Sequence, residues 1–385
     1  MHSCFRALFF LTALCFATAL HALPEGLHYE HLLRDGPLSI HVLEIDPARV
    51  KIVPVHAGKE VLSLETVSSL AERFSAFAAI NGGFFRSQGT YKGTSAGVLR
   101  IGGEWYSSPR FDRGAIGWIQ TIDLQSTTVA IDRIALETRL YAGHAVLPID
   151  GINQPPTMSS AILYTSRFHT STLTSSSFSE MTIDADGRLS EQKGPTSIPS
   201  DGYVYSLAPL AIPFMPFLAP SAHGRVQFEP RALNHPDDSG LWSSFPHIVG
   251  GTPVLISDGE IVRDFALERL PDSFAKERHP RTAIGISKQG RWFVVVVDGD
   301  NQEYSIGMTI DELARFFHEL GCRLALNLDG GSSSTLFLAG AVINAPSGTL
   351  SKNREDLIGI EKPVSDAILF FPSGDFHDDA GSSRP

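Results

Sequence analysis

Cysteine is scarce in this sequence, with three residues in a chain of 385. Cys4 and Cys15 fall in a leader that we expect to be removed, so Cys322 would remain alone and no intrachain disulfide could form. The mature chain must therefore be stabilised by its core. Cys322 follows Gly321 and precedes an apolar run, which predicts a buried small side chain and not a nucleophile.

Charge is also sparse and unbalanced. Charged residues make up 19% of the chain, and 31 basic against 42 acidic residues leave a net charge of −11. An acidic surface repels nucleic acid and anionic lipid, which excludes general DNA or RNA binding. Any anionic substrate would have to be captured by a few local cations. With 43% hydrophobic residues, the chain has the composition of a globular protein with a large core.

A long hydrophobic run occurs once, from Ala7 to Leu20, preceded by the single charge of Arg6. A small residue follows at Ala22, so residues 1–22 are predicted to be a signal peptide, with an uncleaved anchor as the alternative. No later stretch is apolar enough to cross a membrane. We therefore expect an exported protein, periplasmic or secreted, with one domain over residues 23–372 and a flexible tail at 373–385. The oligomeric state is left open.

The patterning predicts a strand-rich single domain of α+β (mixed α/β) class with a few packed helices. Thr309-Ile310-Asp311-Glu312 is a capping box that would open a helix ended by Gly321. The Ser- and Thr-rich residues 157–200 favour exposed strands, and the Pro-rich residues 209–246 favour a surface excursion. Other expected elements are two short strands joined by a turn over 38–55, a helix over 63–74, hairpins at 98–105 and 254–262, and buried strands at 77–80, 291–298, 324–328 and 367–371.

Several enzyme signatures are missing. The chain has no G-x-S-x-G elbow, no Walker A loop and no His-Glu-x-x-His helix, and its 14 His residues are scattered. Instead, three apolar strands end in polar, glycine-rich turns, where a site can form and where backbone N–H groups can bind an anion. These turns are Asn81-Gly82-Gly83, Asp298-Gly299-Asp300 and Asp329-Gly330-Gly331-Ser332-Ser333-Ser334.

Two further interpretations concern charged residues near these turns. Arg281 precedes an apolar strand and could clamp a phosphate or carboxylate, or could equally form a surface ion pair. Asp298, Asp300 and Asp329 could bind a divalent cation, but paired acids serve general acid–base catalysis equally well. No cofactor is expected, and a dedicated zinc site is disfavoured.

Together these segments resemble the phosphodiester glycosidase family over roughly residues 75–371. The resemblance rests on their order, which also includes Glu312-Leu313-Ala314 and Asn344-Ala345-Pro346-Ser347. This chain departs from the family pattern at two positions. Ser332 stands where the family usually has a third glycine. Lys362 stands where the family usually has an arginine, so a guanidinium group that can donate two parallel hydrogen bonds is replaced by an ammonium group with a localised charge.

The resemblance implies hydrolysis of a sugar-1-phosphodiester at the C1–O bond, releasing free sugar and a phosphomonoester. Asp329 or Glu361 would act at C1 or activate water, with Asp298 as the second acid. The substrate-binding residues that it implies are Asn81, Gly82, Arg281, Thr282, Gly330, Gly331, Ser332 and Ser333. Two alternatives stay open: a metal-assisted phosphodiesterase that cuts P–O, and a non-catalytic glycan-binding protein of the cell envelope.

Overall fold

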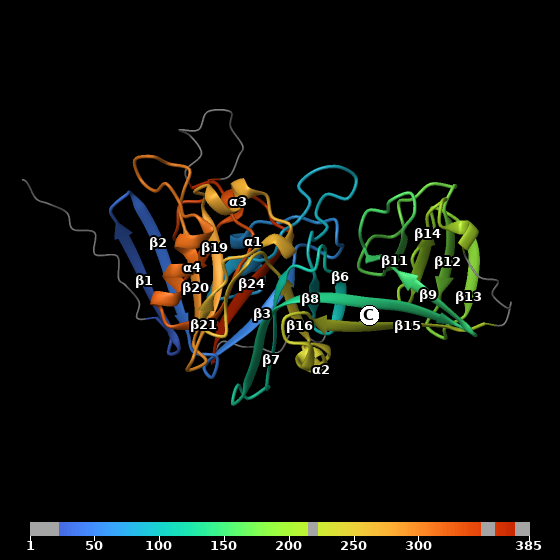
Figure 1. The fold of residues 1–385 in the computed structure, drawn as a ribbon, viewed down its shortest axis with the longest axis horizontal. Coiled ribbons are helices and arrows are strands. Elements are labelled where there is room, and N and C mark those ends of the chain that lie inside the picture. The colour runs from blue at the N-terminus through green and yellow to red at the C-terminus, as the bar shows by residue number, and fades with distance from the viewer. Residues whose placement is uncertain (1–22, 215–221, 348–358, 374–385) are drawn as a thin grey trace, which may run out of the picture.

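The computed structural model describes residues 23–214, 222–347 and 359–373. The predicted signal peptide, and the predicted tail beyond residue 373, lie outside these residues. Among the described helices, none is long and apolar enough to cross a membrane. Strands dominate and helices are few and short, which confirms the α+β prediction (Figure 1).

Most of the core is built on one antiparallel sheet, here called the main sheet. Its central strands are continuous apolar runs because both of their faces are covered. The predicted strand and hairpin positions are confirmed. In spatial order its strands are β1 (Leu27–Arg34), β2 (Leu38–Ile45), β20 (Trp292–Val297), β19 (Arg281–Ser287), β21 (Cys322–Asn327), β17 (Val254–Ser257) and β18 (Glu260–Ile261).

Helix α4 (Ile310–Glu319) covers one face of the main sheet. The predicted capping box is present, since Thr309 and Glu312 exchange side-chain-to-backbone hydrogen bonds. Gly321, with φ of +75°, follows the helix in the left-handed conformation that favours glycine. The apolar stripe of α4 packs on β20 and β21, and Cys322 is buried beneath it as expected.

A second sheet, here called the β4 sheet, packs on the other face of the main sheet. Helix α1 (Val67–Arg73) covers its far side, so the body has four layers: α4, main sheet, β4 sheet and α1. The sheet order is β23 (Ala341–Val342), β22 (Leu336–Leu338), β4 (Ala78–Asn81), β24 (Asp366–Pro372) and β3 (Val50–His56).

Two further sheets, here called the bridging sheet and the outer sheet, extend from this body. Figure 1 shows the long strands β8 and β15 of the bridging sheet running from the body to the outer sheet. The bridging sheet has the order β15 (Gly224–Ala232), β8 (Thr127–Ala142), β7 (Gly114–Gln120), β16 (His247–Gly250), β5 (Leu99–Ile101) and β6 (Glu104–Ser107), with β9 (Ala145–Ile149) beside β8. The outer sheet has the order β10 (Gly151–Ile152), β11 (Ala161–Thr165), β14 (Tyr203–Leu207), β12 (Ser179–Ile183) and β13 (Leu189–Lys193).

These sheets correct two predictions. The Ser- and Thr-rich segment does form strands, but β11 and β12 are largely buried because they carry their own small core. The Pro-rich segment is no surface excursion, since it contains β15 and helix α2 (Ser239–Ser244), with Trp242 fully buried. Pro230 is tolerated in β15 because that strand lies at a sheet edge.

The strand ends that carry the polar turns meet where the main sheet contacts the β4 sheet. In the main sheet, Arg281 pairs with Val297, and Ala283 pairs with Asn327. These pairings place the end of β20, the start of β19 and the end of β21 at one edge. The N–H of Asp329 donates to Gly82 O at 3.2 Å, which joins that edge to the end of β4.

Candidate active site

Asn81 holds the ends of β4, β19 and β21 together. Its side-chain nitrogen donates to Asp329 O at 2.8 Å, and its oxygen accepts hydrogen bonds from Thr282 Oγ1 at 2.8 Å and Thr335 N at 3.2 Å. Asn81 and Thr282 are fully buried. Both were expected to bind substrate, but the structure uses their polar atoms to brace the strand ends.

Asp329 and Asp366 form what we call the acid pair. Asp329 is half-buried after β21, and Asp366, at 1% exposure, begins β24. Burial raises the pKa of Asp329 to about 6, against the opposing effects of Ser333, Lys362 and the Gly330 N–H. Burial, with the charge of Asp329, raises the pKa of Asp366 to about 6 as well. The pair can therefore hold a proton near pH 6, where an ordinary aspartate is ionised.

The Asn-Gly-Gly turn has glycines because the backbone passes directly beside Asp366. The Gly83 N–H donates to Asp366 Oδ2 at 2.8 Å. A Cβ on Gly82 would lie 1.9 Å from that same oxygen, and one on Gly83 would lie 2.7 Å from Gly250 O. No side chain fits at either position without displacing the acid or the backbone. Gly82 thus shapes the site through its lack of a side chain.

Arg281 is a buried cation without a carboxylate partner in the described part of the chain, and its exposure is 2%. Its Nε donates to Met308 O at 2.9 Å, and one terminal nitrogen donates to Phe274 O and Glu277 O, around helix α3 (Asp272–Lys276). Burial lowers its pKa to about 10. Its side chain lies next to Gly330, since a Cβ there would be 3.9 Å from Arg281 Cδ.

The glycine-serine loop after β21 does not present the backbone amides that we expected. The Gly330 N–H donates to Asp329 Oδ1 at 2.9 Å, and the Gly331 N–H donates to Pro280 O at 2.8 Å. The N–H groups of Ser333 and Ser334 also donate within the loop, across a single 3-10 turn at Gly331–Ser333. The prediction that the backbone N–H groups of Gly330 and Gly331 bind an anion was therefore wrong. The loop instead holds Asp329 in place, with Ser333 buried beneath it and Ser332 partly exposed.

The segment before β24 places adjacent residues in different environments. Glu361 accepts hydrogen bonds from the N–H (3.0 Å) and hydroxyl of Ser68, at the start of α1. Lys362 lies toward the site: its Nζ is 3.4 Å from Ser333 Oγ and 4.9 Å from the centre of the Phe85 ring. Lys362, and not Glu361, is thus the charged residue of this segment beside the acid pair.

A cavity of about 480 Å³ is lined by Lys362, whose charge acts on Asp329, although neither acid of the pair lines it. Ser332 and Lys362 both line it, so the two positions where the chain departs from the family pattern face the same space. Such a volume is within the range that holds a sugar-sized ligand. Its other lining residues are Leu64, Phe85, Ser87, Gln88, Lys92 and Pro363.

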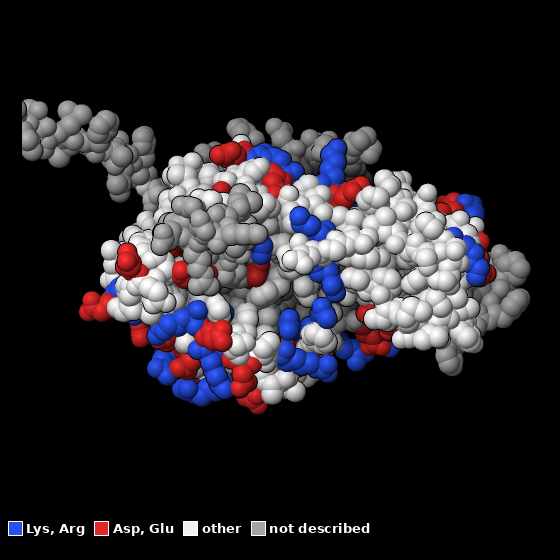
Figure 2. Space-filling model, turned by 90° about the horizontal axis from the view of Figure 1, so that it is seen from above, with Lys and Arg blue, Asp and Glu red and all other residues white. Residues whose placement is uncertain are grey.

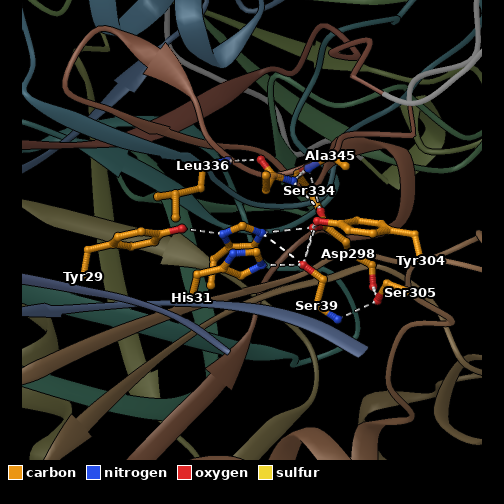
Figure 3. Close-up of polar contacts among 11 residues, drawn as sticks. Tyr29, His31, Ser39, Asp298, Tyr304, Ser305, Ser334, Leu336 and Ala345 are labelled. Carbon is orange, nitrogen blue, oxygen red and sulfur yellow. Dashed lines mark hydrogen bonds and ion pairs between the residues drawn. The ribbon is translucent and has the colours of Figure 1, made fainter. Parts of the chain in front are cut away.

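Asp298, the third predicted acid, lies in a separate buried network (Figure 3). Its Oδ2 accepts hydrogen bonds from Ser39 Oγ at 2.9 Å and His41 Nε2 at 3.0 Å, with Tyr304 Oη at 3.2 Å. Its Oδ1 accepts from the Asn344 side chain and the Ala345 N–H. Burial acts to raise the pKa of Asp298, but His41 and the other donors hold it below its ordinary value.

Asn344 joins this network to the glycine-serine loop. The Asn344 side-chain nitrogen donates to Ser334 O at 3.1 Å as well as to Asp298. Asp298 therefore helps to hold the glycine-serine loop in place through Asn344. Within the described residues, no group of three or more His, Cys, Asp or Glu side chains is placed to hold a metal ion.

Comparison with known proteins identifies the family. The sequence model of the phosphodiester glycosidase family matches residues 179–371, about half of the chain. This protein belongs to the phosphodiester glycosidase family. The match contains Arg281, Asp329, Lys362 and Asp366, whereas the Asn81 turn lies before it. Membership implies a hydrolase of the glycosidase type.

Individual relatives of this chain are distant. A prophage-derived uncharacterised protein of Bacillus subtilis, YomE, is 35% identical over 89 residues, which are 23% of this chain and 14% of that protein's length. A hypothetical protein from Synechocystis has a TM-score of 0.72 at 23% identity, covering 90% of this chain and 62% of the other. A Burkholderia pseudomallei protein described as a candidate for export has a TM-score of 0.73 at 21% identity, covering 87% and 74%. The two structures share the fold.

Asp366 was not among the residues predicted for the site. Asp366 lies at the start of a predicted strand, whereas the three glycine-rich turns predicted to form the site all follow the ends of strands. All strands around the site are antiparallel, so the start of one strand lies beside the end of the next. The polar pair Ser365-Asp366, at the start of the apolar strand β24, is therefore the sequence feature that indicates this acid.

Proposed function

We propose that this protein hydrolyses the glycosidic C1–O bond of sugar-1-phosphodiesters and releases free sugar and a phosphomonoester. The observation that carries the proposal is the acid pair beside two cations. Two carboxyls with raised pKa values adjoin Lys362, and the uncompensated Arg281 lies behind the same loop. Carboxylates stabilise an oxocarbenium-like centre, and cations favour a phosphate group.

Asp329 is the member of the acid pair with exposed surface, so we assign it to the reacting carbon. Its carboxylate would stabilise the positive charge at C1 or take a proton from the attacking water. The C1–O electron pair leaves with the phosphate oxygen, and the water oxygen bonds to C1. Asp366 is too buried to touch substrate and would act through Asp329, whose charge adds to burial in raising the pKa of Asp366.

Lys362 and Ser332 would contact the phosphate or the sugar from the cavity wall. Arg281 would contribute through its charge, since two of its guanidinium nitrogens already donate to backbone carbonyls. We also propose that the protein is exported. The leader at residues 1–22 supports this, as does the description of the structurally similar B. pseudomallei protein.

Hydrolysis in water enriched in heavy oxygen tests the proposal. The purified mature protein would be incubated with a panel of sugar-1-phosphodiesters, with and without a chelator. We expect heavy oxygen at the sugar C1 and none in the phosphate. Heavy oxygen in the phosphate, lost with chelator, would instead identify a metal-assisted phosphodiesterase, and binding without turnover would identify a glycan-binding protein.

Asp329→Asn and Asp300→Asn form a matched pair for the same assay. Both are strand-end aspartates, but Asp300 is exposed and touches only Ser347 Oγ, at 3.4 Å, among its described contacts. Loss of labelled sugar in the Asp329 variant alone would assign the reaction to the acid pair. Equal loss in both variants would contradict that assignment.

A further inference from the structure

A second cavity lies on the other side of the segment that lines the site cavity. This segment, residues 84–96, folds back on itself through a bridge between Phe85 and Ser95. Phe85 and Ser87 line the site cavity, whereas Arg86 and Ser95 line a separate cavity of about 160 Å³. Because alternate side chains of an extended segment point to opposite sides, one segment serves both cavities.

Arginines gather at this second cavity and just beyond it. Arg86 and Arg110 both line it, and the charge of Arg110 adds to burial in lowering the pKa of Arg86. The guanidinium groups of Arg110, Arg113 and Arg269 all lie over the ring of Phe111, at 4.7, 5.5 and 5.2 Å from its centre. Figure 2 shows basic side chains in a line over the middle of the face seen from above.

These charges are poorly neutralised within the protein. Among the described ion pairs and hydrogen bonds, none joins Arg86, Arg110 or Arg269 to a carboxylate. Arg113 donates to the backbone oxygen of Glu268 at 3.0 Å. Like charges held together in a chain of net charge −11 are unfavourable unless an anion compensates them.

A buried hydroxyl completes the cavity. Ser95 is 5% exposed, lines the cavity with the arginines, and its Oγ has no hydrogen-bond partner in the described structure. A buried hydroxyl without a partner costs free energy, so it marks a place where a ligand acceptor would fit. The volume is below the roughly 300–1,000 Å³ of sites for drug-sized ligands, which suits a small group such as phosphate.

The cavity is connected to the acid pair by the same short segment. Gly83 donates to Asp366, and Arg86 follows three residues later, which an extended chain spans in about 10 Å. Between them, Phe84 contacts Phe274, whose ring lies under Arg281. Phe84 also lines a narrow gap together with Arg110 and Arg113. Arg86 therefore lies within about 10 Å of the residue that contacts Asp366, a separation that a neighbouring phosphodiester unit of a substrate can cover.

We propose that Arg86, Arg110 and Ser95 form a second anion subsite, which binds a further phosphate of the substrate beyond the bond that is cut. This inference rests on the proposed function and narrows its substrate class. The preferred substrates are oligomeric or polymeric glycans with repeated phosphodiesters, or sugar phosphodiesters whose aglycone carries its own phosphate.

Kinetics on two defined substrates test the subsite: a sugar-1-phosphodiester with one phosphate, and the same compound with a second phosphate on the aglycone. The double variant Arg86→Gln/Arg110→Gln should raise KM for the second compound about tenfold or more and leave its kcat nearly unchanged. Both kcat and KM for the first compound should stay near the wild-type values. Arg34→Gln is the control, because Arg34 is an exposed arginine paired with Glu319. An unchanged KM ratio between the two compounds would overturn the proposal.

Direct binding separates failure of the subsite from failure of the proposed function. Titration calorimetry with inorganic phosphate and pyrophosphate would use the wild type, the double arginine variant and Ser95→Ala. We expect the double variant to lose one phosphate-binding event and Ser95→Ala, which should fold normally, to weaken that event several-fold, whereas phosphate binding beside Lys362 should be unchanged. If binding is lost as expected but no sugar phosphodiester is hydrolysed, the subsite stands and the proposed reaction fails. If phosphate binds equally to all three proteins, the subsite is refuted.

Discussion

Asp298 and the acid pair are carboxylic acids that lie where strands begin or end, but their surroundings differ. Asp298 accepts hydrogen bonds from five groups, and its pKa is lowered. Asp329 and Asp366 have fewer donors, and their pKa values are raised to about 6. A carboxylate whose charge is fully satisfied stabilises a fold, whereas one whose charge is under-satisfied is poised to react. Five predictions test this contrast and the charges around it.

The largest expected effect is the loss of activity in Asp329→Asn. Removing a carboxylate that acts at the reacting centre should lower kcat by about 10²–10⁴-fold. Folding should be retained, because the amide removes a charge that burial disfavours. Steady-state kinetics with circular dichroism would measure both. Activity within a few fold of wild type in a folded Asp329→Asn protein would remove Asp329 from the mechanism.

Asp298→Asn should behave in the opposite way. The amide cannot accept all the hydrogen bonds that Asp298 receives and leaves His41 without its carboxylate. We therefore expect a loss of unfolding free energy on the order of 3 kcal/mol. Turnover by the folded fraction should remain within several-fold of wild type. Denaturant unfolding and active-site-normalised kinetics check this, and a large kcat loss at unchanged stability would make Asp298 catalytic.

A smaller change is expected at Lys362, whose ammonium group lies at the cavity wall. Lys362→Gln should raise KM for sugar phosphodiesters about tenfold, because a charge-assisted contact to phosphate is lost. Lys362→Arg, which restores the residue usual in the family, should keep KM low. If Lys362→Gln and wild type share one KM, the phosphate does not bind at this wall.

The smallest expected effect is a shift in pH dependence. If ionised Asp329 is required, activity falls as pH decreases through about 6. Asp366→Asn removes the neighbouring negative charge, so the pKa of Asp329 should decrease and the acidic limb of the kcat/KM profile should move to lower pH by about one unit. An acidic limb that stays in place would mean that the two carboxyls are not coupled.

The same raised pKa values determine the sign of a stability effect. The folded protein binds protons at the acid pair that the unfolded chain, with a pKa of 3.8, releases. The stability contribution of the pair is therefore complete below about pH 4 and is lost as pH rises through about 6. Thermal unfolding of wild type and Asp329→Asn at pH 4 and pH 8 should show the variant gaining relative stability at pH 8.

Local sequence patterns were enough to place most helices and strands, although not those of the Pro-rich residues 209–246. Val294 to Val297 could only be a strand covered on both faces, and Thr309 with Glu312 marked the start of α4 through local hydrogen bonds. Ordered motifs also identified the family and the importance of Asp329. These features depend on residues close together in the chain, where periodicity and capping have physical consequences that a sequence displays.

The positions of the polar residues relative to one another depend on how the sheets pack. Asn81, Thr282 and Asp298 became internal supports, whereas Asp366 and Lys362 became neighbours of Asp329. Arg86 and Arg110 were likewise unremarkable in the sequence until folding placed them on one cavity. Burial and hydrogen bonding between strands far apart in the chain set the pKa of a carboxyl, and those contacts exist only after the antiparallel sheets have packed.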